Sequence, residues 1–176
     1  MKNKMLKISA LILTFIILFS ACKNQNEQTE EENPIGFSYD MLDFSIIADE
    51  IYKEADISEL TLESVEKVTN KTTLEEQYNL NLKNIEEYEV RSAEGKFGVA
   101  DIAIIRPKDG FADEVIASLE ERKDDRINEF RNYDVYNSYS ISMNAEIYQA
   151  DELVVMLMFD EDTNENAKKI IDSCIQ

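Results

Sequence analysis

The sequence predicts an α+β fold: a mainly antiparallel four-stranded sheet made of two hairpins, with amphipathic helices packed on it. Two observations lead to this prediction. In some segments apolar residues recur every three or four positions, and in others they alternate or run together between turn residues. The expected order is helix, short helix, two strands, helix, two strands, helix. Strands that follow one another in pairs favour antiparallel hairpins over a parallel sheet.

The first helix is predicted over residues 40–55. Asp40 can cap free backbone amides at its start. Its apolar face is formed by Phe44, Ile47, Ala48, Ile51 and Ala55.

Residues 56–72 fit neither the helical nor the strand period, so we expect a connection there with at most one short turn of helix. Thr73 and Glu76 then have the spacing of a capping box. This pattern predicts a short helix that ends at Tyr78.

The first hairpin is predicted from strands at 85–93 and 99–106. The first strand alternates apolar and charged residues, and the second is almost continuously apolar. Glu94 and Gly95 suit a reversing turn between them. Asp101 interrupts the second strand, either as a solvated or ion-paired acid or as a functional carboxylate.

A long amphipathic helix is predicted over 111–132, capped by Asp109, with Asp113 and Glu114 near the positive end of its dipole. Its apolar stripe comprises Phe111, Val115, Leu119, Ile127 and Phe130, and the aliphatic stems of Arg122 and Lys123 fill the one gap.

Three tyrosines follow this helix in an exit loop: Tyr133, Tyr136 and Tyr139. They are interpreted as packing aromatics, with a ring-stacking ligand surface as the alternative.

The second strand pair is predicted at 145–149 and 153–159. The latter run has no polar residue, which indicates a central strand covered on both faces. A last amphipathic helix then carries Cys174 on its apolar face, as a core residue rather than a reactive thiol. That face is formed by Ala167, Ile170, Ile171 and Cys174.

The start of this last helix resembles a calcium loop, because Asp160, Asp162 and Asn164 have alternate spacing. However, Glu165 stands where such loops need glycine, and Ile171 stands where the twelfth ligand belongs. We therefore predict no metal site and expect Asp162 or Thr163 to cap the helix.

The N-terminal residues have the pattern of a lipoprotein signal peptide. A basic start leads into an apolar run over 8–19, and Ser20, Ala21 and Cys22 follow this run. The run is shorter than the roughly 20 residues of a retained membrane span, which is the alternative. We expect cleavage after Ala21 and a diacylglyceryl anchor on the Cys22 thiol.

Three regions follow from this pattern: a signal peptide at 1–21, the lipidated cysteine and a flexible tether at 22–34, and a single globular domain at 35–176. The tether contains no large apolar residue to bury. Cleavage would leave 15 basic and 37 acidic residues, a net charge of −22. Such a charge disfavours nucleic-acid binding, because phosphate backbones attract clustered Lys and Arg.

Four segments of the predicted elements form a pattern that is known from other proteins: Leu74–Leu80, Ile85–Val90, Asp101–Ile104 and Leu119–Arg122. With these segments in this order, the chain resembles the domain of unknown function 4358 family, whose members are mostly lipoproteins of low-GC Gram-positive bacteria. The resemblance covers roughly 40–171 and departs from the family at 150–152, where a glycine and an aromatic residue are common. It implies a lipoprotein but no activity.

The chain has no histidine, which excludes the Ser-His and Cys-His catalytic arrangements. It also lacks the glycine-rich loops that cradle phosphates. We therefore expect no cofactor and no enzymatic activity, and predict a binding or accessory module of the cell envelope. Its partners would be the membrane, through the lipid on Cys22, and an envelope protein. The alternative is a carboxylate-dependent hydrolase that acts on an envelope polymer.

Overall fold

The computed structural model describes residues 42–93 and 95–175, which fold as an α+β domain with a five-stranded, open, antiparallel sheet. The strand order is β1-β2-β3-β5-β4. The strands are β1 (Val65–Lys67), β2 (Ile85–Ala93), β3 (Asp101–Pro107), β4 (Glu146–Ala150) and β5 (Leu153–Met158). The helices are α1 (Phe44–Glu54), α2 (Ile57–Leu60), α3 (Lys71–Gln77), the 3-10 turn η2 (Leu82–Asn84), α4 (Ala112–Phe130), α5 (Ser138–Met143) and α6 (Glu161–Ile175).

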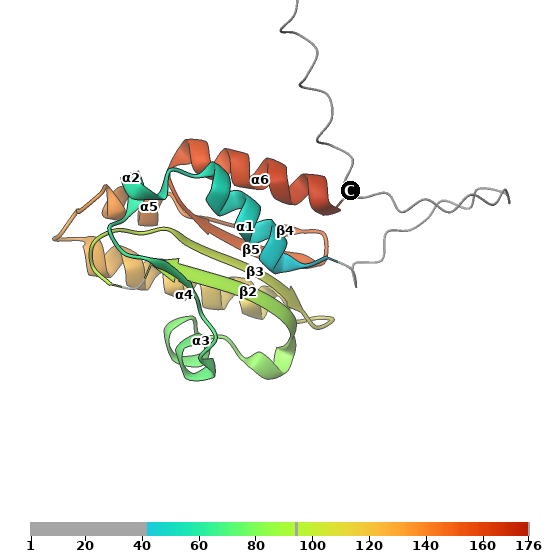
Figure 1. Ribbon diagram of the computed structural model, residues 1–176. Helices are drawn as coiled ribbons and strands as arrows, with labels where there is room; N and C mark the ends of the chain where they lie inside the picture. The colour runs from blue at the N-terminus through green and yellow to red at the C-terminus, as the bar shows by residue number, and fades with distance from the viewer. Residues whose placement is uncertain (1–41, 94, 176) are drawn as a thin grey trace, which may run out of the picture. The chain divides into compact units, whose positions relative to one another are not determined.

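Helices cover both faces of the sheet (Figure 1). On one face α1 and α6 pack together, and the Arg106 guanidinium of β3 lies 5.0 Å from the centre of the Phe44 ring of α1. On the other face lies α4, which is joined to the segment just after α3 by a hydrogen bond from Ser118 Oγ to Asn79 O at 2.8 Å. The two central strands β3 and β5 are therefore buried almost throughout.

The predicted hairpins and the doubly covered strand are confirmed, but the prediction of four strands was wrong. Both β2–β3 and β4–β5 pair antiparallel, and all of 153–159 is buried. The additional strand is β1, which pairs with β2 from Val65 opposite Ala93 to Lys67 opposite Arg91. Strand β1 has only three residues, most of them exposed, and so shows no periodic pattern in the sequence. Its pairing with β2 is what identifies it as a strand.

Two helix starts differ from the predictions. Helix α1 begins at Phe44, and the Asp43 carboxylate caps it by accepting a hydrogen bond from Ser45 N at 3.0 Å. Asp40 lies outside the described residues. Helix α3 begins at Lys71 and is capped by Asn70, so Thr73 lies inside its first turn and is not the cap.

The later helices also begin elsewhere than predicted. The residue at the N-terminal boundary of α4 is Phe111, and no side chain caps that end with a hydrogen bond, so Asp109 is not its cap. Helix α6 is capped by Asp160, whose carboxylate accepts from Thr163 N at 2.9 Å; Asp162 and Thr163 are in the first turn. The short helix α5 was not predicted.

The connection between β2 and β3 is longer than a two-residue turn at Glu94 and Gly95, because β3 begins only at Asp101. In the second hairpin the turn at 151–152 places Asp151 at a φ of +53°, a region that glycine adopts more easily. This chain therefore keeps a conformation suited to glycine without having one there.

Cys174 was predicted to be a core residue; it packs against the core but is only partly buried. None of the helices in the described part of the chain combines the length and apolar character that a membrane span requires. The predicted signal peptide, Ala21, Cys22 and the tether to residue 34 lie outside the described residues.

Candidate functional site

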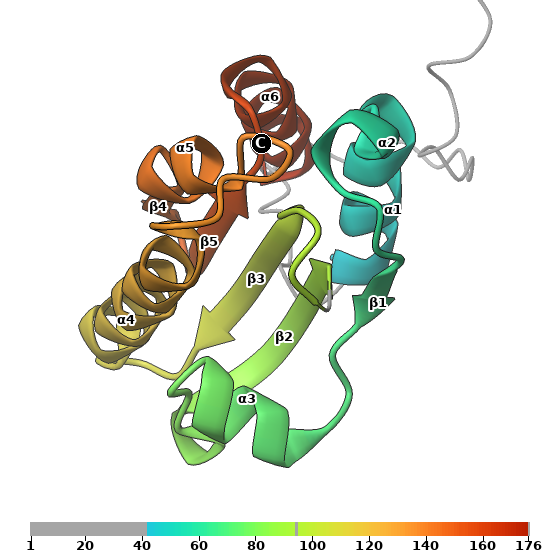
Figure 2. The same ribbon diagram turned by 90° about the vertical axis from the view of Figure 1, so that its left-hand side faces the viewer.

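Three chain connections meet at one end of the sheet, which faces the viewer in Figure 2. They are the α2–β1, β2–β3 and α4–α5 connections. We call this region the loop end and define it by residues 60–64, 95–100 and 129–137.

The first two connections of the loop end are paired through their backbones. Leu62 N donates to Phe97 O at 3.0 Å, and Val99 N donates to Leu60 O at 3.2 Å. Gly98 faces Thr61 in this pairing and has a φ of +137°. A Cβ atom at Gly98 would clash with the backbone of Leu60 and Thr61, so only glycine permits the close approach.

Arg126 of α4 joins this pair to the third connection, and Arg122 of α4 binds the start of β3. Arg126 Nη2 donates to Gly98 O at 3.3 Å, and Arg126 Nη1 donates to Glu129 Oε2 at 2.7 Å. Arg122 Nη2 donates to Asp101 Oδ2 at 3.3 Å, while Asp101 Oδ1 accepts from Ala93 N at 3.1 Å. Both ends of the β2–β3 connection are thereby fixed to α4.

The Asp101 cluster, formed by Asp101, Arg122 and Arg126, is buried. Asp101 is fully enclosed, and the two guanidinium groups lie over the rings of Tyr78 and Phe130 at 4.6 and 4.8 Å. Burial alone would lower the pKa of Arg122, but Asp101 and the other negative groups near it raise this pKa overall. Burial, and then the charge of Asp101, raise the pKa of Tyr78 to about 12. The ion-paired interpretation of Asp101 is therefore confirmed, whereas a solvated acid there is wrong.

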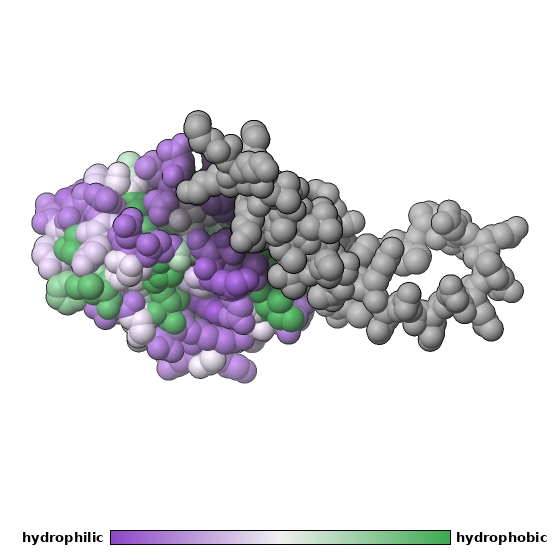
Figure 3. Space-filling model, turned by 45° about the horizontal axis from the view of Figure 1, so that its top comes forward, coloured by the Kyte–Doolittle hydropathy of each residue, from purple (hydrophilic) through white to green (hydrophobic). Residues whose placement is uncertain are grey.

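A hollow of about 300 Å³ opens beside this cluster, lined by Lys96, Glu129, Phe130 and Tyr133. Three large apolar side chains of the loop end are exposed to solvent: Leu62 (70%), Phe97 (47%) and Tyr133 (49%). Among the described residues only Ile46 and Met143 are comparable. In the face drawn in Figure 3, green hydrophobic residues lie at the left-hand end among purple hydrophilic ones, and further green groups lie in the middle of the face and beside the grey atoms. Exposed apolar groups concentrated near a hollow are typical of a binding surface.

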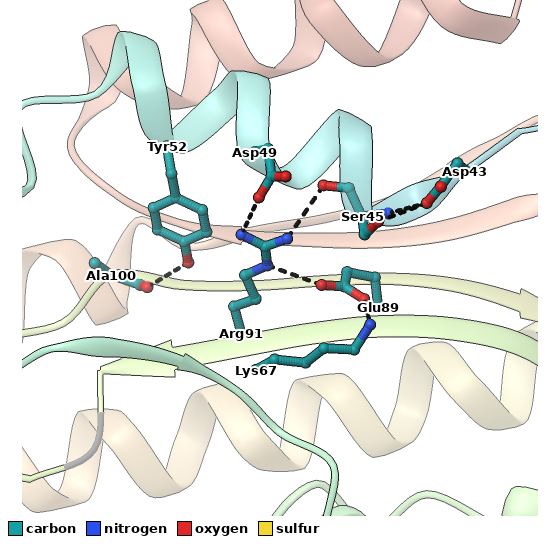
Figure 4. Close-up of polar contacts among 8 residues, drawn as sticks. All are labelled: Asp43, Ser45, Asp49, Tyr52, Lys67, Glu89, Arg91 and Ala100. Atoms are coloured by element: carbon teal, nitrogen blue, oxygen red, sulfur yellow. Dashed lines mark hydrogen bonds and ion pairs between the residues drawn. The ribbon is translucent and has the colours of Figure 1, made fainter.

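A second polar cluster lies on the opposite face of the sheet, between α1 and β2 (Figure 4). Arg91 donates to Glu89 Oε1 at 2.8 Å, to Asp49 Oδ1 at 2.6 Å and to Ser45 O at 3.1 Å. The remaining Glu89 oxygen pairs with Lys67 of β1. Burial would lower the pKa of Arg91, but hydrogen bonds to Glu89 and Asp49 raise it overall. Each ligand of this arginine belongs to a packed element, so the cluster fastens α1 and β1 to the sheet.

Tyr52 of α1 extends this fastening to the loop end. Its hydroxyl donates to Ala100 O at 2.7 Å, and burial raises its pKa well above the ordinary value. The loop end is thus held from both faces of the sheet.

The three tyrosines that follow α4 differ in their exposure to solvent. Tyr133 is exposed and lines the hollow, which fits the alternative of a ligand surface. Tyr136 and Tyr139 are partly buried, and Tyr139 packs against the core in α5. No sequence pattern singled out Phe97 or Leu62, because each is an isolated apolar residue in a loop.

The calcium-like stretch serves the fold. Asn164 is buried, and its side chain accepts from Phe159 N at 3.2 Å and donates to Phe159 O at 3.3 Å. Asp160 is used as a helix cap, so neither side chain is turned outward as a ligand. In the part of the chain that the structure describes, no three acidic or cysteine side chains are grouped to hold a metal ion.

Residues 58–159 match the family described as Domain of unknown function (DUF4358). The chain belongs to this family. The matched segment contains all the chain connections of the loop end, whereas α1 and α6 lie outside it. DUF4358 membership assigns no activity. Neither the curated proteins nor the solved structures gave a match to this chain.

Proposed function

We propose that this DUF4358 protein is an extracytoplasmic, membrane-anchored lipoprotein that acts in the cell envelope as a non-enzymatic binding or accessory module. The observation that carries the proposal is the loop end. There Leu62, Phe97 and Tyr133 are exposed near a hollow, on connections that are fixed from both faces of the sheet. Binding residues are commonly found on loops that a rigid scaffold positions.

The buried carboxylates support binding over hydrolysis. Asp101 faces α4, and Glu89 faces α1 on the other side of the sheet; each is paired with cationic side chains. A glycosidase needs two carboxyl groups flanking one bond, roughly 5 to 10 Å apart. Glu129 is the acid that lines the hollow, and it is itself paired with Arg126.

The anchor rests on the sequence around Cys22. Its thiolate is the nucleophile that a diacylglyceryl transfer needs, and serine is a much weaker one. Metabolic labelling with a fatty-acid analogue should mark the wild-type protein, and Cys22→Ser should carry no label. A label retained by this variant would refute the lipoprotein proposal.

The binding role is tested by affinity purification of the full chain from membranes, with Cys22→Ser as the matched control. One envelope protein should copurify reproducibly with the lipidated chain and less with the control. Turnover of purified envelope polymer by the protein, abolished by a single Glu→Gln or Asp→Asn change, would instead establish the hydrolase.

A further inference from the structure

We infer that the loop end is a protein-docking surface that takes a basic segment carrying an apolar side chain. This inference rests on the proposed binding role. It adds the kind of partner and the charge of the contact.

Helix α1 runs toward the loop end. Its first residue, Phe44, lies at Arg106, near the end of β3, whereas Tyr52 in its last turn reaches Ala100 at the loop end. The 11 residues of α1 span about 16 Å at 1.5 Å per residue. Figure 1 shows the start of α1 and the end of α6 on the right and the loop end on the left, so the start of α1 supplies a control position away from the loop end. The acidic charge of the loop end repels anionic lipid headgroups, which favours a protein over the bilayer as the occupant.

The apolar part of the surface suits one anchoring side chain. The hollow of about 300 Å³ is at the lower limit of small-molecule sites. Its floor includes the fully buried Phe130, and its rim includes the half-exposed ring of Tyr133. Energetically dominant contacts between proteins commonly consist of a large apolar side chain in such a pocket.

The charge around the surface is acidic. Seven acidic and three basic residues lie in the segments that form or flank the loop end. These segments are 58–66, 95–98 and 124–134. Arg126 is already engaged by Glu129 and Gly98. Asp125 is exposed and lies one helical turn before Glu129, on the side of α4 that faces the hollow. A basic partner segment is therefore complementary, and an acidic one would be repelled.

The test is site-specific photo-crosslinking with the full-length lipidated chain in the cells that produce it. A photoreactive residue is placed at Phe97 or Tyr133, and at Ile46 as the control, because Ile46 is an exposed apolar residue at the opposite end. Crosslinks should form from Phe97 and Tyr133, and mass spectrometry should find a Lys- or Arg-rich peptide with an apolar residue at the attachment point. Crosslinks to lipid or to an acidic peptide would overturn the inference.

The charge is tested by Asp125→Asn, with Asp113→Asn in the first turn of the same helix as the matched control. Asp125→Asn should lower the crosslinking yield at least about threefold, because rim charges set the rate of association, and Asp113→Asn should not. Equal yields from both variants would contradict the acidic contact. Crosslinks to a protein from Ile46 but not from Tyr133 would refute the docking surface and leave the binding role intact. No protein crosslinks from any position would refute both.

Discussion

Asp101→Ala removes the carboxylate that pairs with the buried guanidinium groups of Arg122 and Arg126, of which Arg126 keeps a second partner in Glu129. Asp101 is completely enclosed, and the side chains of Arg122 and Arg126 are only 10% and 4% exposed. The change also takes away the acceptor of the Ala93 N hydrogen bond.

The expected loss of stability is about 3 to 5 kcal/mol, the usual cost of leaving a buried charge without its partner. Since domains of this size unfold with about 5 to 15 kcal/mol, roughly a fifth or more of the total would be lost. At about 2 to 4 °C per kcal/mol, the melting temperature should fall by roughly 6 to 20 °C.

The assay is thermal and urea unfolding of the purified protein. Asp101→Asn keeps an oxygen for Ala93 N but not the charge, so its loss should be smaller than that of Asp101→Ala. Exposed Asp125→Asn should stay within about 0.5 kcal/mol of wild type. If Asp101→Ala melts within about 2 °C of wild type, the ion pairs do not support the fold as argued.

The other expected outcomes concern the loop end, the central strand and alkaline pH. Gly98→Ala should cost at least about 1 to 3 kcal/mol in urea unfolding, because the added Cβ clashes with Leu60 O in a left-handed conformation; Gly110→Ala, where the Cβ meets nothing, should cost clearly less. Val155→Asp puts an unpaired carboxylate on a fully buried strand and should abolish cooperative unfolding in circular dichroism; an unchanged melt would mean that β5 is exposed. The folded protein retains the Tyr78 proton up to a pKa of about 12, while the unfolded chain loses it near 10, so stability should fall by about 2 to 3 kcal/mol between pH 10 and 12. Tyr78→Phe should flatten this decline, and a decline that is identical in both proteins would show that Tyr78 is not its source.

Elements with a strong local pattern were predictable from the sequence. Strand β2 has the predicted bounds because its polar and apolar residues alternate, and 153–159 is apolar on both faces. Strand β1 and helix α5 were missed because their stability comes from neighbours. Val65–Lys67 pairs with β2, and the backbone N–H of Tyr139 in α5 is held by Asp134 at 3.0 Å.

Only part of the site could be predicted. The sequence marks Asp101 as an acid inside an apolar strand and places Arg122 on the apolar stripe of α4. The same helical period points to Arg126, which lies four positions after Arg122 and four before Phe130, but the prediction of the stripe omitted it. The loop end depends on contacts between connections that are distant in sequence, such as Leu62 with Phe97, and no local pattern contains them.

The strand order has a consequence for how the chain acquires its structure. Asp101 of β3 pairs with Met158 of β5, 57 residues later, and β4 joins the sheet only through β5. A chain that emerges N-terminus first, from a ribosome or a translocation channel, cannot complete its sheet until its last residues are free. Until then the inner edge of β3 exposes unpaired backbone N–H and C=O groups, together with apolar side chains, to any neighbouring chain. Contacts of such long sequence separation also slow folding, so a protein truncated before β5 should aggregate instead of folding in part.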